Sequence, residues 1–200
     1  MTVFHLLRHG EPAVLGRLNG RLPGVGLSAT GRAEIAAQAR RLAGENIEAI
    51  YASPMQRTRE TAEILSDRLR LPIHYREDVI EIDYGEWTGL TFDEIRRDER
   101  WQMWSRSRGI AATPGGESWR HVQDRVVGAL FDLHQGHPND SVVIVTHGDA
   151  IRAALLFALG MPLDFYSRIE VAFASLSTIR LDGSGIRVLG INNWPRLASP

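Results

Sequence analysis

Two histidines stand where they could act on an anionic group. Each follows a short apolar segment and precedes a glycine: the tripeptide Arg8-His9-Gly10 follows residues 3–7, and the pair His147-Gly148 follows residues 142–146. The β-branched and aliphatic residues of both segments predict strands, and glycine allows a close turn of the backbone. Because ligands of open α/β sheets bind at the carboxyl ends of strands, we expect two imidazoles and an arginine at one such edge. This set could bind an anion and attack it.

Arg57 and Glu81 could complete a site for a phosphoryl group. The fork of Arg57, like that of Arg8, matches the geometry of phosphate oxygens. A histidine can attack phosphorus and carry it as phosphohistidine, while a carboxylic acid such as Glu81 can protonate the leaving oxygen. The second imidazole and the N–H groups at a helix N-terminus would stabilise the remaining oxygens. The arginines and histidines offset the phosphate charge, so we expect neither a metal ion nor another cofactor.

Taken one at a time, these residues also fit roles without chemistry. Arg57 lies near Glu60 on an expected helix, where salt bridges along the helix are common. Glu81 has acidic neighbours and could be a solvated loop charge, and a single His-Gly pair could belong to a turn. The joint presence of all these groups favours the catalytic interpretation.

The composition sets further limits. The chain has 200 residues and a formal net charge of −1, which suits one domain over residues 1–200 and gives no indication of nucleic-acid or membrane binding. It contains no cysteine, so disulfides, thiolate zinc sites and cysteine nucleophiles are excluded, and it contains no lysine. No apolar run approaches the roughly 20 residues that cross a bilayer. The start carries no basic leader, so we expect a cytoplasmic protein.

Strands and helices are expected to alternate along the chain. Strands are expected at residues 3–7, 47–52, 73–76, 142–146, 174–181 and 185–191, the last two forming a hairpin. Helices are expected at residues 30–43, 55–68, 91–107, 119–134 and 149–159, and a long loop rich in glycine and proline spans residues 10–26. This alternation favours an α/β layered fold.

Six sequence blocks give the chain a resemblance to a known family. They are residues 7–11 (Leu-Arg-His-Gly-Glu), 27–31, 53–62, 81–89, 114–118 (Pro-Gly-Gly-Glu-Ser) and 145–148 (Val-Thr-His-Gly). In this order they resemble the histidine phosphatase superfamily, with its phosphoglycerate mutase-like fold. The resemblance implies a three-layer α/β/α sandwich around a mostly parallel central sheet, and no metal cofactor. It further implies that His9 is the nucleophile and that Glu81 is the proton donor and later the base. The phosphate would be held by Arg8, Arg57, His147 and Gly148.

Leu15 departs from the family pattern. Many members have an asparagine six residues after the nucleophile, and a leucine side chain cannot form a hydrogen bond with phosphate. Asn19 and Arg21 are the candidates to replace it, although Arg21 could equally be a solvated loop residue.

The segment after Glu81 bears on the reaction. Residues 84–90 (Tyr-Gly-Glu-Trp-Thr-Gly-Leu) resemble the phosphatase branches of the family, including α-ribazole phosphatase and broad-specificity phosphatases. We therefore expect a phosphoric monoester hydrolase that acts on a small-molecule phosphate ester through a phosphohistidine. A cofactor-dependent phosphoglycerate mutase is the alternative. A non-catalytic binding protein is a third hypothesis, which the complete set of site residues disfavours.

Residues 91–118 are expected to form a helical cap near the site. Trp101, Met103 and Trp104 in this segment could bind an apolar leaving group, although such residues at helical spacing more often belong to a core. The exposed face of the hairpin near residues 175–191 could support contacts in a homodimer.

Overall fold

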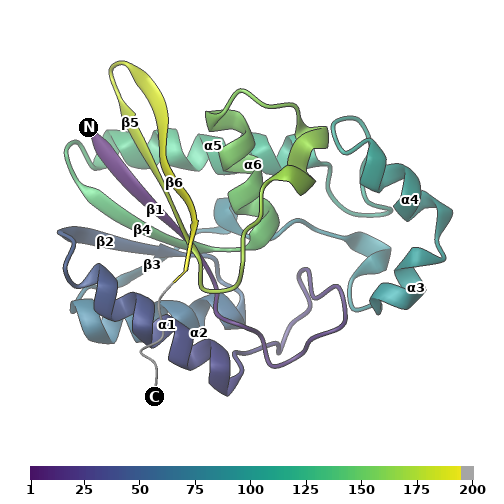
Figure 1. Cartoon of the computed structure of the whole chain (residues 1–200), viewed down its shortest axis with the longest axis horizontal. Coiled ribbons are helices and arrows are strands. Elements are labelled where there is room, and N and C mark those ends of the chain that lie inside the picture. The colour runs from purple at the N-terminus through teal and green to yellow at the C-terminus, as the bar shows by residue number, and fades with distance from the viewer. Residues whose placement is uncertain (195–200) are drawn as a thin grey trace.

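The computed structural model describes residues 1–194 and is built around one six-stranded sheet (Figure 1). Its strands are β1 (Thr2–Arg8), β2 (Ile47–Ala52), β3 (Ile73–Tyr75), β4 (Ser141–Thr146), β5 (Leu176–Asp182) and β6 (Gly185–Asn193). Their order across the sheet is β3-β2-β4-β1-β5-β6. The first four strands in this order are parallel, whereas β5 and β6 are antiparallel to their neighbours. The sheet is therefore mostly parallel, as expected.

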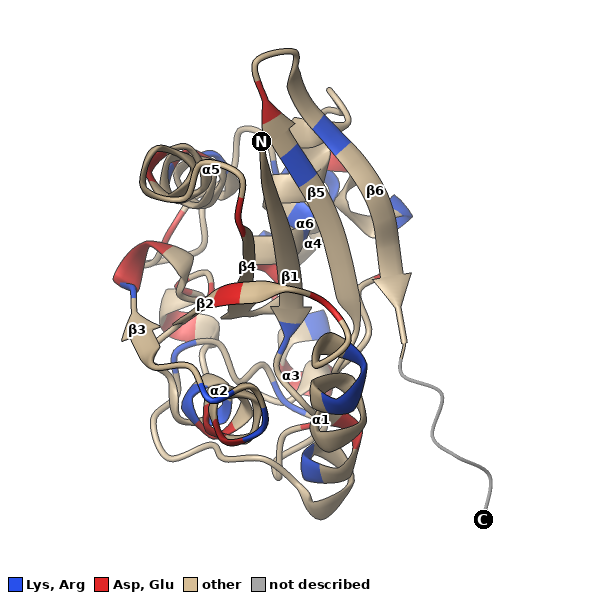
Figure 2. Cartoon of the chain, turned by 90° about the vertical axis from the view of Figure 1, so that its left-hand side faces the viewer, with Lys and Arg blue, Asp and Glu red and all other residues tan. Residues whose placement is uncertain are grey.

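Helices cover both faces of the sheet. The helices α1 (Ala29–Leu42) and α2 (Gln56–Leu69) lie on one face, and α5 (Trp119–Gly136) and α6 (Gly148–Ala158) lie on the other (Figures 1 and 2). Alternate residues of β4 enter two separate apolar cores: Val143 packs in the core with α1 and α2, and Ile144 packs in the core with α5 and α6. The expected three-layer α/β/α sandwich is confirmed.

The helix expected over residues 91–107 is instead two short helices, α3 (Phe92–Arg96) and α4 (Glu99–Arg106). Thr91 and Glu94 form a capping box that begins α3. Asp98 then begins a new helix, because its carboxylate accepts a hydrogen bond from the Arg100 backbone and another from the indole of Trp87. Short 3₁₀ turns occur at Glu77–Val79, Gly85–Trp87 and Leu163–Arg168. Within residues 1–194, none of the helices combines the length and the apolarity needed to span a bilayer.

The pairing of β1 with β4 brings the two histidine segments together. Their parallel register places Arg8 opposite Thr146 at the carboxyl ends of both strands. His9 continues this alignment, because its backbone N–H donates to the carbonyl of Thr146 at 3.0 Å. The residues that follow the two strands, His9 and His147, therefore start side by side at one edge of the sheet.

The turn after His9 is pressed against the first turn of α1. A Cβ atom added at Gly31 would lie 2.3 Å from the carbonyl oxygen of Glu11, and one added at Gly10 would lie 2.6 Å from the carbonyl oxygen of Gly31. Only glycine at these two positions allows the backbones to approach so closely. The contact fixes where the chain goes after the histidine.

We expect Gly31→Ala to destabilise the protein by about 1–3 kcal/mol, since the new methyl group would overpack against backbone atoms that cannot move aside. Gly128→Ala is the matched control, because Gly128 also lies in a helix but has open space around its Cα. There the change is expected to be neutral or stabilising by up to about 1 kcal/mol, from the better helix propensity of alanine. Urea unfolding measures both, and equal effects at the two positions would contradict the packing argument.

Candidate active site

His9 presents an unprotonated ring nitrogen in a buried setting. Its Nδ1 lies 2.8 Å from the carbonyl oxygen of Gly10, which can only accept, so Nδ1 carries the proton. The other ring nitrogen, Nε2, accepts a hydrogen bond from Arg57 Nε at 3.2 Å. Burial, together with the positive charges of Arg57 and Arg8, lowers the pKa of His9 well below its usual value. The imidazole is therefore neutral, and its unprotonated nitrogen is Nε2, whose lone pair accepts the hydrogen bond from Arg57 in this structure.

Arg57 connects both histidines to the glycine-rich loop. It lies in the first turn of α2, and its Nη2 donates to the carbonyl of Gly20 at 2.6 Å and lies 3.1 Å from His147 Nδ1. Its side chain is almost fully buried, and its Nη1 has no hydrogen-bond partner within residues 1–194. Burial lowers the pKa of Arg57, but an arginine remains charged. A buried guanidinium with an unused donor is a strong attractor for an anion.

His147 is held in a single neutral form. Because Arg57 only donates, His147 Nδ1 accepts from it, and the other nitrogen, Nε2, donates to Ser53 Oγ at 2.7 Å. Burial and the charge of Arg57 lower the pKa of His147 well below its usual value. Its ring stands edge-on to that of His9, with 5.3 Å between the ring centroids.

Arg8 approaches the start of α6 through a gap that Gly148 leaves open. A Cβ atom at Gly148 would lie 3.3 Å from the guanidinium carbon of Arg8, tighter than an ordinary contact. The Arg8 side chain donates to the Val171 carbonyl at 2.6 Å and stacks on the ring of Phe173, while its Nε has no partner among the described residues. Burial lowers the pKa of Arg8 to about 10, so it stays cationic at neutral pH.

Glu81 is a buried carboxyl group in the same cavity. Burial and the negative charge of Asp149 raise the pKa of Glu81 to about 7, although Arg57 and Arg8 act in the opposite direction. Its Oε1 accepts a hydrogen bond from the backbone N–H of Ile82 at 3.0 Å. A carboxyl group in this state can both give and take a proton near neutral pH.

Asp149, directly after the second His-Gly pair, belongs to a buried charged group that sequence reasoning missed. Burial alone would raise the pKa of Asp149, but Arg108, Arg152 and the hydroxyl of Tyr84 outweigh it and lower the pKa. The Tyr84 hydroxyl donates to Asp149 at 2.6 Å and Arg152 donates to it at 3.0 Å. Arg108 stacks on the rings of Trp104 and Tyr166. Asp149 could have been predicted from its position directly after His147-Gly148, whereas no sequence signal marks Arg108.

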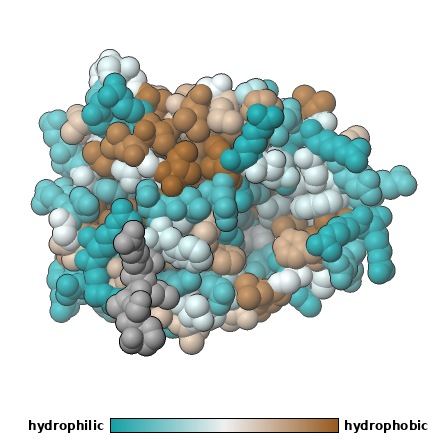
Figure 3. All heavy atoms as spheres, in the orientation of Figure 1, coloured by the Kyte–Doolittle hydropathy of each residue, from teal (hydrophilic) through white to brown (hydrophobic). Residues whose placement is uncertain are grey.

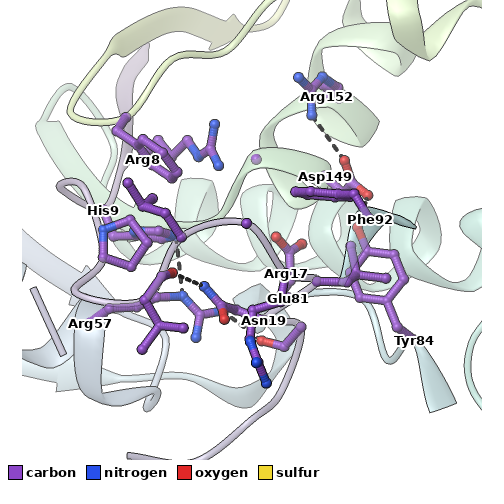
Figure 4. A pocket seen from close by; sticks show the side chains of 18 residues that line it. Arg8, His9, Arg17, Asn19, Arg57, Glu81, Tyr84, Phe92, Asp149 and Arg152 are labelled. Atoms are coloured by element: carbon purple, nitrogen blue, oxygen red, sulfur yellow. Dashed lines mark hydrogen bonds and ion pairs between the residues drawn. The ribbon is translucent and has the colours of Figure 1, made fainter. Parts of the chain in front are cut away.

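These groups surround a cavity of about 380 Å³ (Figure 4). Of the residues expected at the site, six line it: Arg8, His9, Asn19, Arg57, Glu81 and Gly148. His147 stands behind the cavity surface, in contact with Arg57. The opposite side is formed by the Asp149 group, and apolar side chains such as Leu15 and Phe92 border the opening. Within residues 1–194, no three His, Asp or Glu side chains cluster in a way that could hold a metal ion.

The two candidates to replace the family asparagine lie in different places. Asn19 lines the cavity, but its amide nitrogen donates to the Val14 carbonyl at 2.8 Å, and its Oδ1 is buried without a partner among the described residues. Arg21 does not line the cavity. Its guanidinium instead donates to the backbone carbonyl of Glu81 and to the carboxylate of Glu117, so its donors are already used outside the cavity.

The tryptophans of the expected cap form a core. Trp104 is buried and packs edge-on against Trp87 and Tyr84, while Trp101 packs on both indoles. Neither Trp101 nor Met103 lines the cavity, so an aromatic leaving group would not meet them there. Phe92 from the start of α3 reaches the cavity instead.

The structure is an α/β protein in which two neutral imidazoles and two arginines meet at one edge of the sheet. A sequence profile of the histidine phosphatase superfamily (branch 1) matches residues 4–194, and the chain belongs to this superfamily. The chain is 31% identical over 196 residues to phosphoserine phosphatase 1 of Hydrogenobacter thermophilus, covering 96% of this chain and 92% of that protein.

Two solved structures extend the comparison. Bacillus stearothermophilus YhfR superimposes with a TM-score of 0.91 at 30% identity, covering 96% of this chain and 98% of that one. A variant of phosphoserine phosphatase from Entamoeba histolytica, in complex with phosphoserine, superimposes with a TM-score of 0.85 at 26% identity, covering 96% and 97%. The prediction of a phosphoric monoester hydrolase of the histidine phosphatase type is confirmed at the level of this class.

Ser53→Ala tests how His147 is held. The substitution leaves the buried N–H of His147 without an acceptor, so we expect a loss of about 1–3 kcal/mol in the free energy of unfolding. Ser184→Ala is the control, since that hydroxyl bonds Asp182 on an exposed turn and its loss should stay within about 0.5 kcal/mol. Chemical denaturation of the two variants gives both values, and a Ser53→Ala variant as stable as the control would contradict the assigned tautomer.

Proposed function

We propose that this protein is a metal-independent phosphomonoesterase that works through a phosphohistidine at His9. The observation that carries the proposal is the setting of His9 Nε2, a neutral nitrogen lone pair facing the buried guanidinium of Arg57. The unused donors on Arg8 Nε and Arg57 Nη1 supply the hydrogen bonds that phosphate oxygens require. Two cations and two neutral imidazoles suit a phosphate dianion.

In the first step, the lone pair of His9 Nε2 attacks phosphorus and the bond from phosphorus to the ester oxygen breaks. Protonated Glu81 gives its proton to the departing oxygen, which leaves as an alcohol. The Nδ1–H of His9 remains bonded to the Gly10 carbonyl, which stabilises the positive charge that develops on the ring. Arg8, Arg57 and the N–H groups at the start of α6 hold the phosphoryl oxygens.

In the second step, the same carboxylate works as a base. Glu81 takes a proton from a water molecule, the water oxygen attacks phosphorus, and the bond to His9 Nε2 breaks. Phosphate leaves, Glu81 is protonated again and His9 returns to its neutral form. A pKa near neutrality suits Glu81 to both halves of this cycle.

Phosphoglycerate mutase activity is the rival within the same fold. A mutase would return the phosphoryl group from His9 to the substrate faster than to water. The phosphatase names of the relatives support hydrolysis. Phosphoserine is the ester bound in one of those relatives, so small phosphorylated metabolites are the substrate class we propose.

His9→Ala is expected to lower turnover of phosphate esters by on the order of 10³-fold or more, because no other group replaces the nucleophile. Free phosphate and isomerised 3-phosphoglycerate are measured with EDTA present, together with base-stable phosphate bound to the protein. His74→Ala, on the outer strand β3, is the matched control and should keep full activity. An active His9→Ala variant would overturn the mechanism, loss of activity in EDTA would overturn metal independence, and isomerised product without free phosphate would indicate a mutase.

The raised pKa of Glu81 predicts the pH dependence of the first step. A carboxyl group whose pKa is raised stays protonated to higher pH, so kcat/KM for an alkyl phosphate should hold until about pH 7 and fall above it. The fall should approach about tenfold per pH unit as Glu81 ionises. In Glu81→Gln the fall of kcat/KM that is due to Glu81 disappears, whereas the titration of the substrate phosphate remains. The ratio of the wild-type pH profile to the variant profile therefore shows the contribution of Glu81 alone. A limb that survives in Glu81→Gln would assign it to another group.

The segment at residues 91–118 we infer to be a helical cap within a single domain. Its start pairs with the glycine-rich loop, since the N–H of Phe92 donates to the Gly16 carbonyl and that of Leu18 donates to the Leu90 carbonyl. Phe92 and Leu15 face the opening from these two segments. They would contact the leaving group.

We further propose that the protein forms a homodimer and is cytoplasmic. The strand β6 lies at an edge of the sheet, and its Leu189 and Ile191 are exposed. Figure 3 shows hydrophobic residues gathered over β6 and α6. A second copy could cover this face, and the molar mass in solution decides between monomer and dimer.

A further inference from the structure

The backbone around Glu81 is held by three charged side chains that do not reach the cavity. Arg21 comes from the glycine-rich loop, Glu117 from the Pro-Gly-Gly-Glu-Ser turn and Arg125 from α5. Arg125 donates twice to the Glu117 carboxylate, at 2.8 and 3.0 Å, and Arg21 donates to it at 3.0 Å. We call these three residues the carbonyl clamp.

Each arginine of the carbonyl clamp also binds the chain next to the carboxyl group. Arg21 Nε donates to the backbone carbonyl of Glu81 at 2.9 Å. Arg125 Nη1 donates to the carbonyls of Asp78 and Ile80 at 3.0 and 2.7 Å. The clamp therefore binds the backbone at Glu81 itself and at two of the three residues that precede it.

Glu117 adds two bonds on the other side of Glu81. Its carboxylate accepts from the Asp83 N–H at 3.3 Å, and its own N–H donates to the Asp83 carbonyl at 2.9 Å. Burial alone would raise the pKa of Glu117, but Arg125, the Asp83 N–H and Arg21 outweigh burial and lower it. Glu117 is thus a buried, charged centre with four donors around one carboxylate.

We propose that Glu117, acting through Arg21 and Arg125, is a positioning residue that fixes the acid Glu81 relative to His9. The clamp bonds the Glu81 segment to the glycine-rich loop, and the Gly20 carbonyl of the same loop binds Arg57, which contacts His9. Glu81 and His9 are therefore both positioned by this loop. This proposal rests on the proposed function of Glu81. A displacement of the Glu81 carboxyl group by about 1 Å slows proton transfer to the leaving oxygen far more than it weakens phosphate binding.

The leaving group distinguishes positioning from general stability. An alkyl alcohol is a poor leaving group and needs the proton from Glu81, whereas p-nitrophenolate leaves with little help. Glu117→Gln keeps the side-chain shape but removes the charge that gathers the two arginines. We expect it to lower kcat/KM for O-phosphoserine by at least about tenfold more than for p-nitrophenyl phosphate. A role in stability alone would lower both equally.

Arg21→Lys is the second variant, since Arg21 is partly exposed and the change preserves charge. Lysine keeps the pairing with Glu117 but lacks the fork that also reaches the Glu81 carbonyl, so the same selective loss is expected. Asp182→Asn removes a carboxylate that pairs with Arg180 on the remote hairpin and should leave the substrate ratio unchanged. If Glu117→Gln does not fold, the ratio in Arg21→Lys decides.

Glu81→Gln is measured in parallel to separate the acid role of Glu81 from the positioning role of the carbonyl clamp. If Glu81→Gln itself shows no preference between the esters, the acid role in the proposed function is wrong. If Glu81→Gln is selective while folded Glu117→Gln and Arg21→Lys lower both esters equally, the clamp is overturned and the proposed function stands.

Discussion

The site depends on one buried cation. Arg57 contacts both histidines and a loop carbonyl, yet within residues 1–194 no carboxylate forms a hydrogen bond or ion pair with it. Removing a guanidinium from water is costly unless hydrogen bonds and opposite charge replace the hydration. Here the bonds come from neutral imidazoles and a carbonyl, and the nearby carboxyl group of Glu81 adds an electrostatic interaction that favours the charged form of Arg57. Burial first, and that charge second, lower the pKa of both imidazoles, and the charge predisposes the cavity to a dianion.

The fold brings these groups together by backbone contacts rather than by side-chain pairing. The parallel register of β1 and β4 sets the two histidine segments in line, and the N–H of His9 continues the ladder. The close contact of Gly10 with Gly31 then determines the direction in which the chain leaves. Each of these constraints acts on the backbone next to His9, so small changes there have large effects on the geometry of its ring.

Sequence patterns predicted the strands, the layered α/β fold and the residues that follow β1 and β4. These predictions succeeded because the spacing of apolar residues and the position of a residue at a strand end can be read from a short stretch of the chain. They could not place Arg21, whose partners Glu81 and Glu117 lie 60 and 96 positions away. The break between α3 and α4 was missed because the spacing of apolar residues does not show that Asp98 both caps α4 and accepts a hydrogen bond from the distant Trp87 indole, a tertiary contact. The charged group around Asp149 was missed for the same reason: Arg108 joins it through tertiary stacking on aromatic rings.

The proton on His9 Nδ1 is held by the carbonyl of the next residue in the chain, and no side chain takes part. His9 Nδ1 therefore keeps its proton when the side chains that border the opening change. The side chains of Leu15 and Phe92 border the cavity opening and take no part in this bond. The shape of the opening and the tautomer of His9 are thus set by different parts of the structure, a separation that would let the proposed reaction be kept while the ester at the opening differs.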